Sequence, residues 1–314
     1  MTYVTGGPIA ALDYNTFSTL SGGMNEIYAD LHSGATTLPN AGYGYGQTPA
    51  LTAVSAGNTI LATQWDALFQ TMRKCGTHQG TTVVPPLPVS DPAAGDVIAA
   101  YNTPTTLSAL VATLTTNRFN LAVGQTAFTS TAFVQPPAVI PWTNTLTFNY
   151  RVNFSSWNNA RYFFNSGGFV TLSGNYSLPT TPEEIEWQSM FTNMSPLVFN
   201  KNSTTPNTGS GGTAIGFYNL TTSPQVVYFK NYGSGVYTAS YIQVTAWLVN
   251  AAGTDGQVNF SIELVNLDSS PPPTPKTHAT TYTVNEYHSS GVIAYPGPAV
   301  AITAVGANNG FIST

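Results

Sequence analysis

The chain has 314 residues, a length that suggests about two domains, and only 7% of them are charged, whereas soluble domains carry about 25%. The 42% of apolar residues and 12% of aromatic residues exclude an intrinsically disordered chain. The net charge is −5 and the eight basic residues form no cluster, so we expect no nucleic-acid partner.

Cys75 is the only cysteine, which excludes an intrachain disulfide and a cysteine-ligated metal site. We expect neither a signal peptide nor membrane insertion, because the first residues lack a basic segment and no run of about 18 apolar residues occurs. The polar residues are mostly Thr, Ser, Asn and Gln. These neutral groups are cheaper to desolvate than charges when two surfaces join, which favours a subunit of an assembly.

A first helix is predicted from apolar residues spaced three and four apart: Phe17, Leu20, Met24, Ile27 and Leu31. Asp13 is the candidate N-cap. Gly22 and Gly23 interrupt the pattern at a cost of about 1 kcal/mol each relative to Ala. This helix therefore depends on tertiary contacts.

A second helix is predicted from a stronger apolar stripe: Trp65, Leu68, Phe69 and Met72. Thr63 and Asp66 resemble a capping box, and Gly76 is the expected end. Arg73 and Lys74 lie in the predicted last turn, where the helix dipole favours cations.

The segment between these helices, Gly42 to Gln47, is a predicted glycine-rich loop that carries Tyr43 and Tyr45. Four prolines predict a stiff connector after the second helix: Pro85, Pro86, Pro88 and Pro92. A third helix is predicted from about Thr106, with one apolar stripe and Arg118 near its end: Leu107, Leu110, Val111 and Leu114. We accordingly expect a helical attachment region at residues 1–80 and a connector with a helix at 81–142.

From about residue 143 the apolar period changes to two, which predicts a half-buried strand: Leu146, Phe148, Tyr150, Val152 and Phe154. Two later runs flank the turn at residues 254–256 and predict a hairpin: Ile242, Val244, Ala246 and Leu248, then Val258, Phe260, Ile262 and Leu264. Further strands are expected near residues 169–172, 214–220, 225–229 and 281–287. Residues 143–314 therefore predict an antiparallel, jelly-roll-like β-sandwich.

One helix is predicted within this sandwich. Thr181 is its N-cap, Pro182 its first residue and Glu184 the capping-box partner, followed by an apolar stripe: Trp187, Met190, Phe191 and Met194. We expect it to cover the sandwich. A second rigid loop follows from four prolines: Pro271, Pro272, Pro273 and Pro275. The expected fold is α+β, mainly β, with an N-terminal helical region before the sandwich.

No residue pattern indicates catalysis. Glu183, Glu184 and Glu186 form the only carboxylate cluster, and helix capping explains them better than a glycosidase pair. The four histidines lack metal-ligand spacing; we expect His78 to bond the end of the second helix, although an axial metal at His78 or His288 of a trimer stays open. We expect no catalytic residue, no cofactor-binding residue and no enzyme.

Several aromatic residues lie next to glycine-rich turns and suit either a binding surface or the core: Tyr43, Tyr45, Tyr232, Tyr237 and Tyr241. For these five tyrosines taken together, we favour burial in the core over a binding surface. Trp65, His78, Tyr43 and Tyr45 are nevertheless candidates for contacts of the N-terminal attachment region.

The segment Ala-Arg-Tyr-Phe-Phe-Asn-Ser-Gly-Gly at residues 160–168 resembles a string found in virion structural proteins of tailed phages, notably cyanophages and related marine phages. Residues 13–15, 44–47, Trp65 and 78–80 are also similar to that family, so the resemblance covers most of the chain. It implies a structural or tail-fibre-like virion protein and brings no catalytic residues. Phe169 and Val170 follow the two glycines at a place where the family usually has polar and charged residues.

The motif residues are expected to have a structural role: Arg161, Tyr162, Phe163, Phe164, Asn165, Gly167 and Gly168. Arg161 is placed to stack on a ring or cap a strand edge. Gly167 and Gly168 allow a tight turn with positive φ.

These observations predict a non-enzymatic virion component attached to the tail, baseplate or neck. Its expected partners are other phage structural proteins and further copies of itself, with a trimer favoured. One alternative is a receptor- or glycan-binding module that contacts the host surface through its tyrosine-rich loops. A second is a polysaccharide depolymerase that uses Glu183, Glu184 or Glu186.

Overall fold

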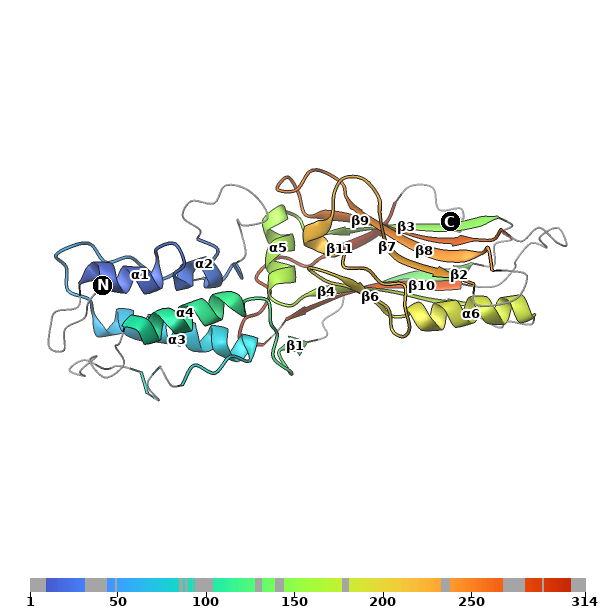
Figure 1. Cartoon of the computed structure of the whole chain (residues 1–314). Coiled ribbons are helices and arrows are strands. Elements are labelled where there is room, and N and C mark those ends of the chain that lie inside the picture. The colour runs from blue at the N-terminus through green and yellow to red at the C-terminus, as the bar shows by residue number, and fades with distance from the viewer. Residues whose placement is uncertain are drawn as a thin grey trace. The chain divides into compact units, whose positions relative to one another are not determined.

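The computed structural model describes residues 10–31, 44–48, 50–84, 87, 90–91, 93, 104–127, 132–138, 144–176, 181–232, 238–267, 280–289 and 291–305 (Figure 1). The chain divides into two compact units. Unit 1 contains residues 1–128, 161–167 and 288–297, and unit 2 contains residues 129–160, 168–287 and 298–314. Among the described residues, no helix combines the length and apolar character needed to span a membrane.

The described residues of unit 1 form four helices that share one apolar core: α1 (Ala11–Ser18), α2 (Met24–Tyr28), α3 (Ala62–Gln79) and α4 (Pro104–Thr116). The stripes predicted for the second and third helices face this core. Because Leu107, Leu110 and Leu114 of α4 are buried with α1 to α3, α4 belongs to the helical unit. The structure thus differs from the expected division at residue 80. The prolines of the expected connector and of the second proline loop lie outside the described residues.

The first predicted helix is two short helices. Gly22 has φ +82°, a left-handed conformation that suits glycine and separates α1 from α2. Leu20 and Leu31 are 43% and 55% exposed, so they do not share the buried face. Asp13 is not the N-cap; its carboxylate accepts a hydrogen bond from the Ala10 N–H, 3.0 Å away, from the third position of α1.

Helix α3 is longer than predicted at its C-terminal end. It continues through Gly76 and ends before Gly80, which has φ +72°. Gly76 has a packing role instead: a Cβ added there would lie 2.4 Å from Val83 Cγ1, so glycine lets the following chain pack against the helix. At the start of α3, Gln64 Oε1 accepts a hydrogen bond from the Leu61 N–H at 2.8 Å, in place of the predicted Thr63 and Asp66 pair.

Two antiparallel sheets contain the strands. One has the order β1-β10-β4-β5-β6, with β2 also paired to β10, and the other has the order β11-β3-β9-β8-β7. The short β1 pairs with the last two residues of β10. The strand bounds are β1 (Thr126–Ala127), β2 (Ala132–Ala138), β3 (Thr145–Asn153), β4 (Phe169–Tyr176), β5 (Leu197–Phe199), β6 (Thr204–Thr205), β7 (Gln225–Asn231), β8 (Tyr241–Leu248), β9 (Gln257–Val265), β10 (Thr280–Ser289) and β11 (Ala301–Ala304).

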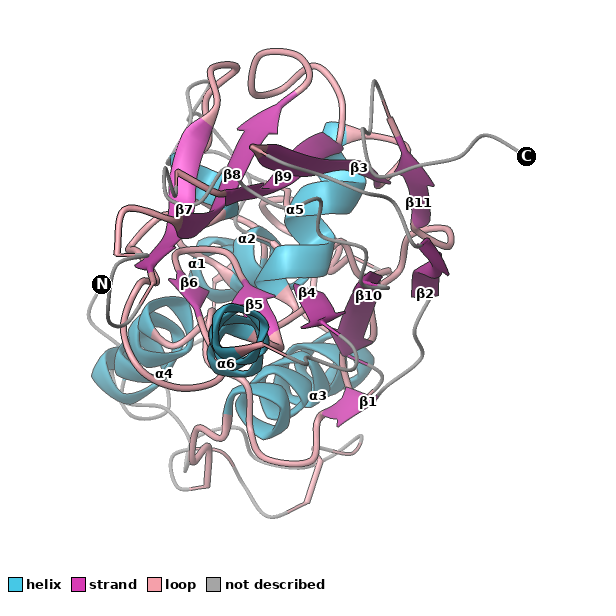
Figure 2. Ribbon diagram, turned by 90° about the vertical axis from the view of Figure 1, so that its right-hand side faces the viewer, coloured by secondary structure: helices cyan, strands magenta, loops and turns pink. Residues whose placement is uncertain are grey.

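The strands of unit 2 form the predicted sandwich, and Figure 2 shows their two layers. Even-numbered residues of β3 are buried and odd-numbered ones are half-buried, which confirms the period of two. Phe199 of β5 and Phe260 of β9 bring the layers together, with ring centroids 5.1 Å apart. The β8–β9 hairpin is confirmed. Strands β2, β3 and β4 alternate between sheets as in a jelly roll, whereas β7, β8 and β9 form a meander.

The helical content among the strands differs from the prediction. Helix α6 (Pro182–Met194) is confirmed and packs on β4, but a second helix, α5 (Trp157–Asn165), was not predicted. The strand expected at residues 214–220 is wrong: it contains a 3-10 turn, η2 (Phe217–Asn219). Phe217 is buried there with its ring centroid 4.9 Å from that of Trp157, so its apolar character reflects this contact.

Candidate functional site

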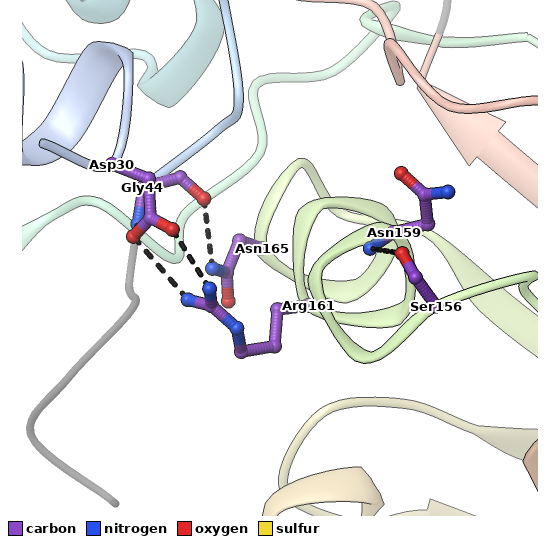
Figure 3. A network of polar contacts seen from close by, with 6 residues as sticks. All are labelled: Asp30, Gly44, Ser156, Asn159, Arg161 and Asn165. Atoms are coloured by element: carbon purple, nitrogen blue, oxygen red, sulfur yellow. Dashed lines mark hydrogen bonds and ion pairs between the residues drawn. The ribbon is translucent and has the colours of Figure 1, made fainter. Parts of the chain in front are cut away.

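Helix α5 carries most of the motif at residues 160–168, and its local sequence explains why it forms. Ser156 Oγ accepts a hydrogen bond from the Asn159 N–H at 3.1 Å, which is the geometry of an N-cap (Figure 3). Four apolar residues at helical spacing are buried: Trp157, Ala160, Phe163 and Phe164. Gly167 follows the helix with φ +88°, which confirms the predicted turn at that glycine. These signals are all present in the sequence, although only a turn at Gly167 and Gly168, and no helix before them, is predicted above.

The polar residues of the motif bind the N-terminal part of unit 1 through an arrangement that we call the motif clamp: Asp30, Gly44, Arg161 and Asn165. Arg161 Nη2 lies 2.8 Å from Asp30 Oδ2, and its Nη1 donates to Asp30 Oδ1 at 3.3 Å. Asp30 Oδ1 also accepts from the Gly44 N–H at 3.1 Å. Asn165 Nδ2 donates to the Gly44 carbonyl oxygen at 2.9 Å (Figure 3).

This ion pair is buried, since the side chains of Arg161 and Asp30 are only 8% and 7% exposed. Two charges removed from water are stable only with close geometry and further hydrogen bonds, which the paired contacts and Gly44 supply here. The guanidinium carbon also lies 5.6 Å from the Tyr162 ring centroid, so the predicted ring contact of Arg161 is confirmed. Asp30 has φ +72°, an uncommon conformation for a residue other than glycine.

The glycine-rich loop at residues 44–47 packs against both α2 and the motif. The Tyr45 N–H donates to the Ile27 carbonyl at 2.9 Å, and Gln47 Nε2 donates to the Ala294 carbonyl at 2.8 Å. Gly46 has φ +68°, and a Cβ added there would lie 2.4 Å from Tyr162 Cδ2. Two segments that carry the resemblance, far apart in the sequence, therefore lie against each other within unit 1.

Tyr45 and His78 are core residues, which corrects their assignment as attachment candidates. Neither side chain is exposed to solvent, and their ring centroids lie 5.1 Å apart in an edge-to-face contact. The Tyr45 hydroxyl donates to the Arg118 carbonyl at 2.5 Å and accepts from Gln79 Nε2 at 2.9 Å. His78 lies within α3 and its imidazole is not at the subunit surface. The side chain of His288 and all of His32 and His278 lie outside the described residues.

Trp65 is likewise buried, with 1% exposure, between Tyr14 and Phe69. Its role as an attachment residue is therefore corrected to core packing, and Tyr43 lies outside the described residues. Tyr232 is also buried: its hydroxyl donates to the Glu183 carbonyl and its ring centroid is 5.6 Å from that of Trp187. The core interpretation thus holds for Tyr45 and Tyr232, Tyr241 is half-buried, and Tyr237 lies outside the described residues.

The capping role predicted for the carboxylate cluster is confirmed at Glu184. Its Oε2 accepts from the Thr181 N–H at 2.9 Å, and Thr181 Oγ1 accepts from the Glu184 N–H at 3.3 Å. Cys75 is a fully buried thiol whose pKa is raised by burial. A thiol that resists ionisation is a poor nucleophile, so its environment suits packing.

Replacing Tyr45 with phenylalanine is expected to lower the free energy of unfolding by about 1–3 kcal/mol at neutral pH, because the Arg118 carbonyl loses its donor. Burial raises the pKa of Tyr45 above the ordinary value of 10.0. The unfolded chain therefore loses this proton first, and the stability that the protonated phenol contributes is complete below about pH 10 and falls above it.

Urea unfolding of both proteins between about pH 8 and pH 11 measures this difference, which should narrow above about pH 10. A constant difference between wild type and Tyr45→Phe across this range contradicts the prediction.

No protein-family model matches the chain, and no curated protein or solved structure is significantly similar to it. Among the described residues, no three His, Cys, Asp or Glu side chains are placed to hold a metal ion together. The function is therefore inferred from the chain's own residues and contacts.

Proposed function

We propose that the chain is a non-enzymatic structural protein of a tailed-phage virion, a fibre-like component of the tail, baseplate or neck that assembles through neutral surfaces. The resemblance at residues 160–168 supports the virion. The observation that carries the structural role is the outer face of the five-stranded sheet. We use this name for the side chains of β3, β8 and β9 that point away from the other sheet.

The outer face is a nearly uncharged array of hydrogen-bonding side chains, of which Thr245, Asn259 and Ser261 are buried and the others half-buried. Cross-strand partners form three successive rows: Thr147–Glu263–Gln243, Asn149–Ser261–Thr245 and Arg151–Asn259–Trp247. Among them only Arg151 and Glu263 are charged, and each has a neutral neighbour on the same face. Arg151 Nε donates to Asn259 Oδ1 at 3.0 Å, and Ser261 Oγ donates to Glu263 Oε1 at 3.4 Å.

Such a face suits association better than a charged one. Hydroxyl and amide groups lose less on desolvation than ions, and they can form new hydrogen bonds across an interface. The strands also hold these groups in fixed rows, so little ordering is required when a partner binds. Through this face the chain forms a symmetric homo-oligomer, with a trimer favoured. Other phage structural proteins are its further partners.

Introducing lysine at Thr147 and Gln243 is expected to weaken self-association about tenfold or more, because an interface would then have to bury added charge. Both positions lie opposite Glu263, so strand pairing should tolerate the change. Mass photometry over a concentration series measures the oligomeric state. The matched control carries Thr222→Lys and Thr254→Lys, two exposed loop positions of unit 2.

The control variant should assemble like the wild type. A wild-type chain that stays a monodisperse monomer contradicts the assembly role, as does a Thr147→Lys/Gln243→Lys variant that assembles normally. A cryo-electron microscopy map of the intact particle tests the virion assignment, and a complete map without this chain rejects it.

A second candidate function is glycan binding, which the aromatic side chains of the same sheet favour. Phe229 is 40% exposed, its ring centroid lies 5.0 Å from that of Tyr241, and Trp247 lies opposite Asn259. Aromatic rings beside amides and hydroxyls supply both apolar and hydrogen-bonding contacts for a neutral sugar. Glycan-array binding that Trp247→Ala removes, with the oligomeric state unchanged, separates this function from scaffolding alone.

A further inference from the structure

Unit 1 contains a cavity of about 320 Å³ between its first two helices, the segment at residues 50–52 and α3. This volume lies at the lower end of the range of about 300–1,000 Å³ found for small-molecule sites. Tyr14, Tyr28 and Leu51 contribute buried apolar surface, while Thr71 and Lys74 contribute polar groups from one face of α3. The cavity is separate from the outer face described above and belongs to a different unit.

One wall of the cavity is held by asparagine side chains that bind backbone. Asn25 Nδ2 donates to the Leu51 carbonyl at 2.8 Å, and the Leu51 N–H donates to Asn25 Oδ1 at 2.7 Å. Asn15 makes the same pair of bonds with Val54, at 2.8 and 2.9 Å. Each amide thus satisfies both backbone groups of its partner, which fixes the segment without a ligand. A pre-formed cavity binds with a low ordering cost.

The lining residues define the charge that the cavity accepts. Apart from the two tyrosines, Lys74 is the only ionisable residue among them, and none is acidic. Gln70, which lines the cavity, donates from Nε2 to the Asp66 carboxylate at 3.0 and 3.1 Å and to Asp91 Oδ2 at 3.5 Å. The side chain of Lys74 is exposed, so its ammonium group can reach an anion beside the apolar floor.

We propose that this cavity binds an apolar group that carries a carboxylate, with the apolar part against Tyr14, Tyr28 and Leu51 and the carboxylate at Lys74. This goes beyond the structural function proposed above, and its test is independent of the oligomeric state. Two sources present this chemistry: a free amphipathic acid, or the C-terminal residue of a partner chain. Phenylacetate represents the first source and the peptide Gly-Gly-Phe the second.

Saturation-transfer NMR on the full chain tests the proposal with phenylacetate, its neutral analogue phenylacetamide and the cationic phenethylamine. Phenylacetate should bind, and phenethylamine should not. Lys74→Gln should weaken the binding of phenylacetate about two- to fivefold, as expected for an exposed ion pair. Ala67→Leu, which fills the cavity, should abolish it, with circular dichroism used to verify folding. Lys230→Gln on β7 is the matched control and should bind like the wild type.

Tighter binding of Gly-Gly-Phe than of phenylacetate assigns the cavity to a partner chain, and the reverse order assigns it to a free acid. The proposal is overturned if phenylacetate shows no saturable binding up to about 10 mM. It is also overturned if phenethylamine binds equally well, or if Lys74→Gln binds phenylacetate like the wild type.

Discussion

Replacing Arg161 with methionine is expected to lower the free energy of unfolding of unit 1 by about 3–5 kcal/mol. Methionine keeps much of the length of the arginine side chain but removes both contacts to Asp30. The Asp30 carboxylate then remains in a site that is only 7% exposed, with the Gly44 N–H as its remaining clamp donor. An unpaired buried charge costs far more than the loss of a surface ion pair.

Hydrogen exchange of α3 amides, followed by mass spectrometry, measures this change within unit 1. Arg151→Met is the control. Arg151 is half-buried and bonds the neutral Asn259 in unit 2, so its cost, measured on the amides of β9, should stay below about 1.5 kcal/mol. Adding Asp30→Asn to Arg161→Met should recover part of the loss, since asparagine is uncharged and tolerates the positive φ. If Arg161→Met costs no more than Arg151→Met, the motif clamp does not hold unit 1 together.

Replacing Gly46 with alanine is expected to destabilise unit 1 by about 2–4 kcal/mol. Two effects contribute. The backbone has φ +68°, which is unfavourable for an L-residue with a side chain. The new Cβ would also lie 2.4 Å from Cδ2 of Tyr162, so the motif ring would have to move away from the loop.

The chain offers a control that separates these effects. Gly57 has φ +85° but no atom within 4 Å of an added Cβ, so Gly57→Ala should carry only the backbone cost of about 1–2 kcal/mol. In a Tyr162→Ala background, Gly46→Ala should cost no more than Gly57→Ala. The same hydrogen-exchange measurement applies, and an equal cost of Gly46→Ala in both backgrounds contradicts the proposed contact with Tyr162.

Both predictions concern contacts that α5 makes with Asp30 and with the glycine-rich loop at residues 44–47. These segments include part of the sequence on which the proposed relation to phage virion proteins rests. The residues of these segments bind one another and the backbone. Similar residues in phage virion proteins would therefore reflect the same internal packing, and not a shared binding surface. The surfaces that meet partners would then be elsewhere: the outer face of the five-stranded sheet and the cavity beside Lys74.

Several local elements of this protein follow from its sequence alone. The alternation in β3, the apolar stripe of α4 and the capping box of Thr181 and Glu184 were all read directly, because period and cap chemistry depend on residues a few positions apart. Helix α5 was equally local. Its Ser156 cap and its apolar spacing lie within a few positions of one another, just before the two glycines.

Which of these elements meet does not follow from local patterns and is seen in the folded chain. Arg161 finds Asp30 across 131 positions of sequence, and Tyr45 and Trp65 turn inward although they lie beside a glycine-rich loop and at a helix start. Gly76 lies inside α3, and Val83 packs where a side chain of this residue would stand. The physical reason is that a periodic pattern marks which face of an element is buried, whereas its partner is selected by long-range packing and by the hydrogen bonds that buried polar groups require.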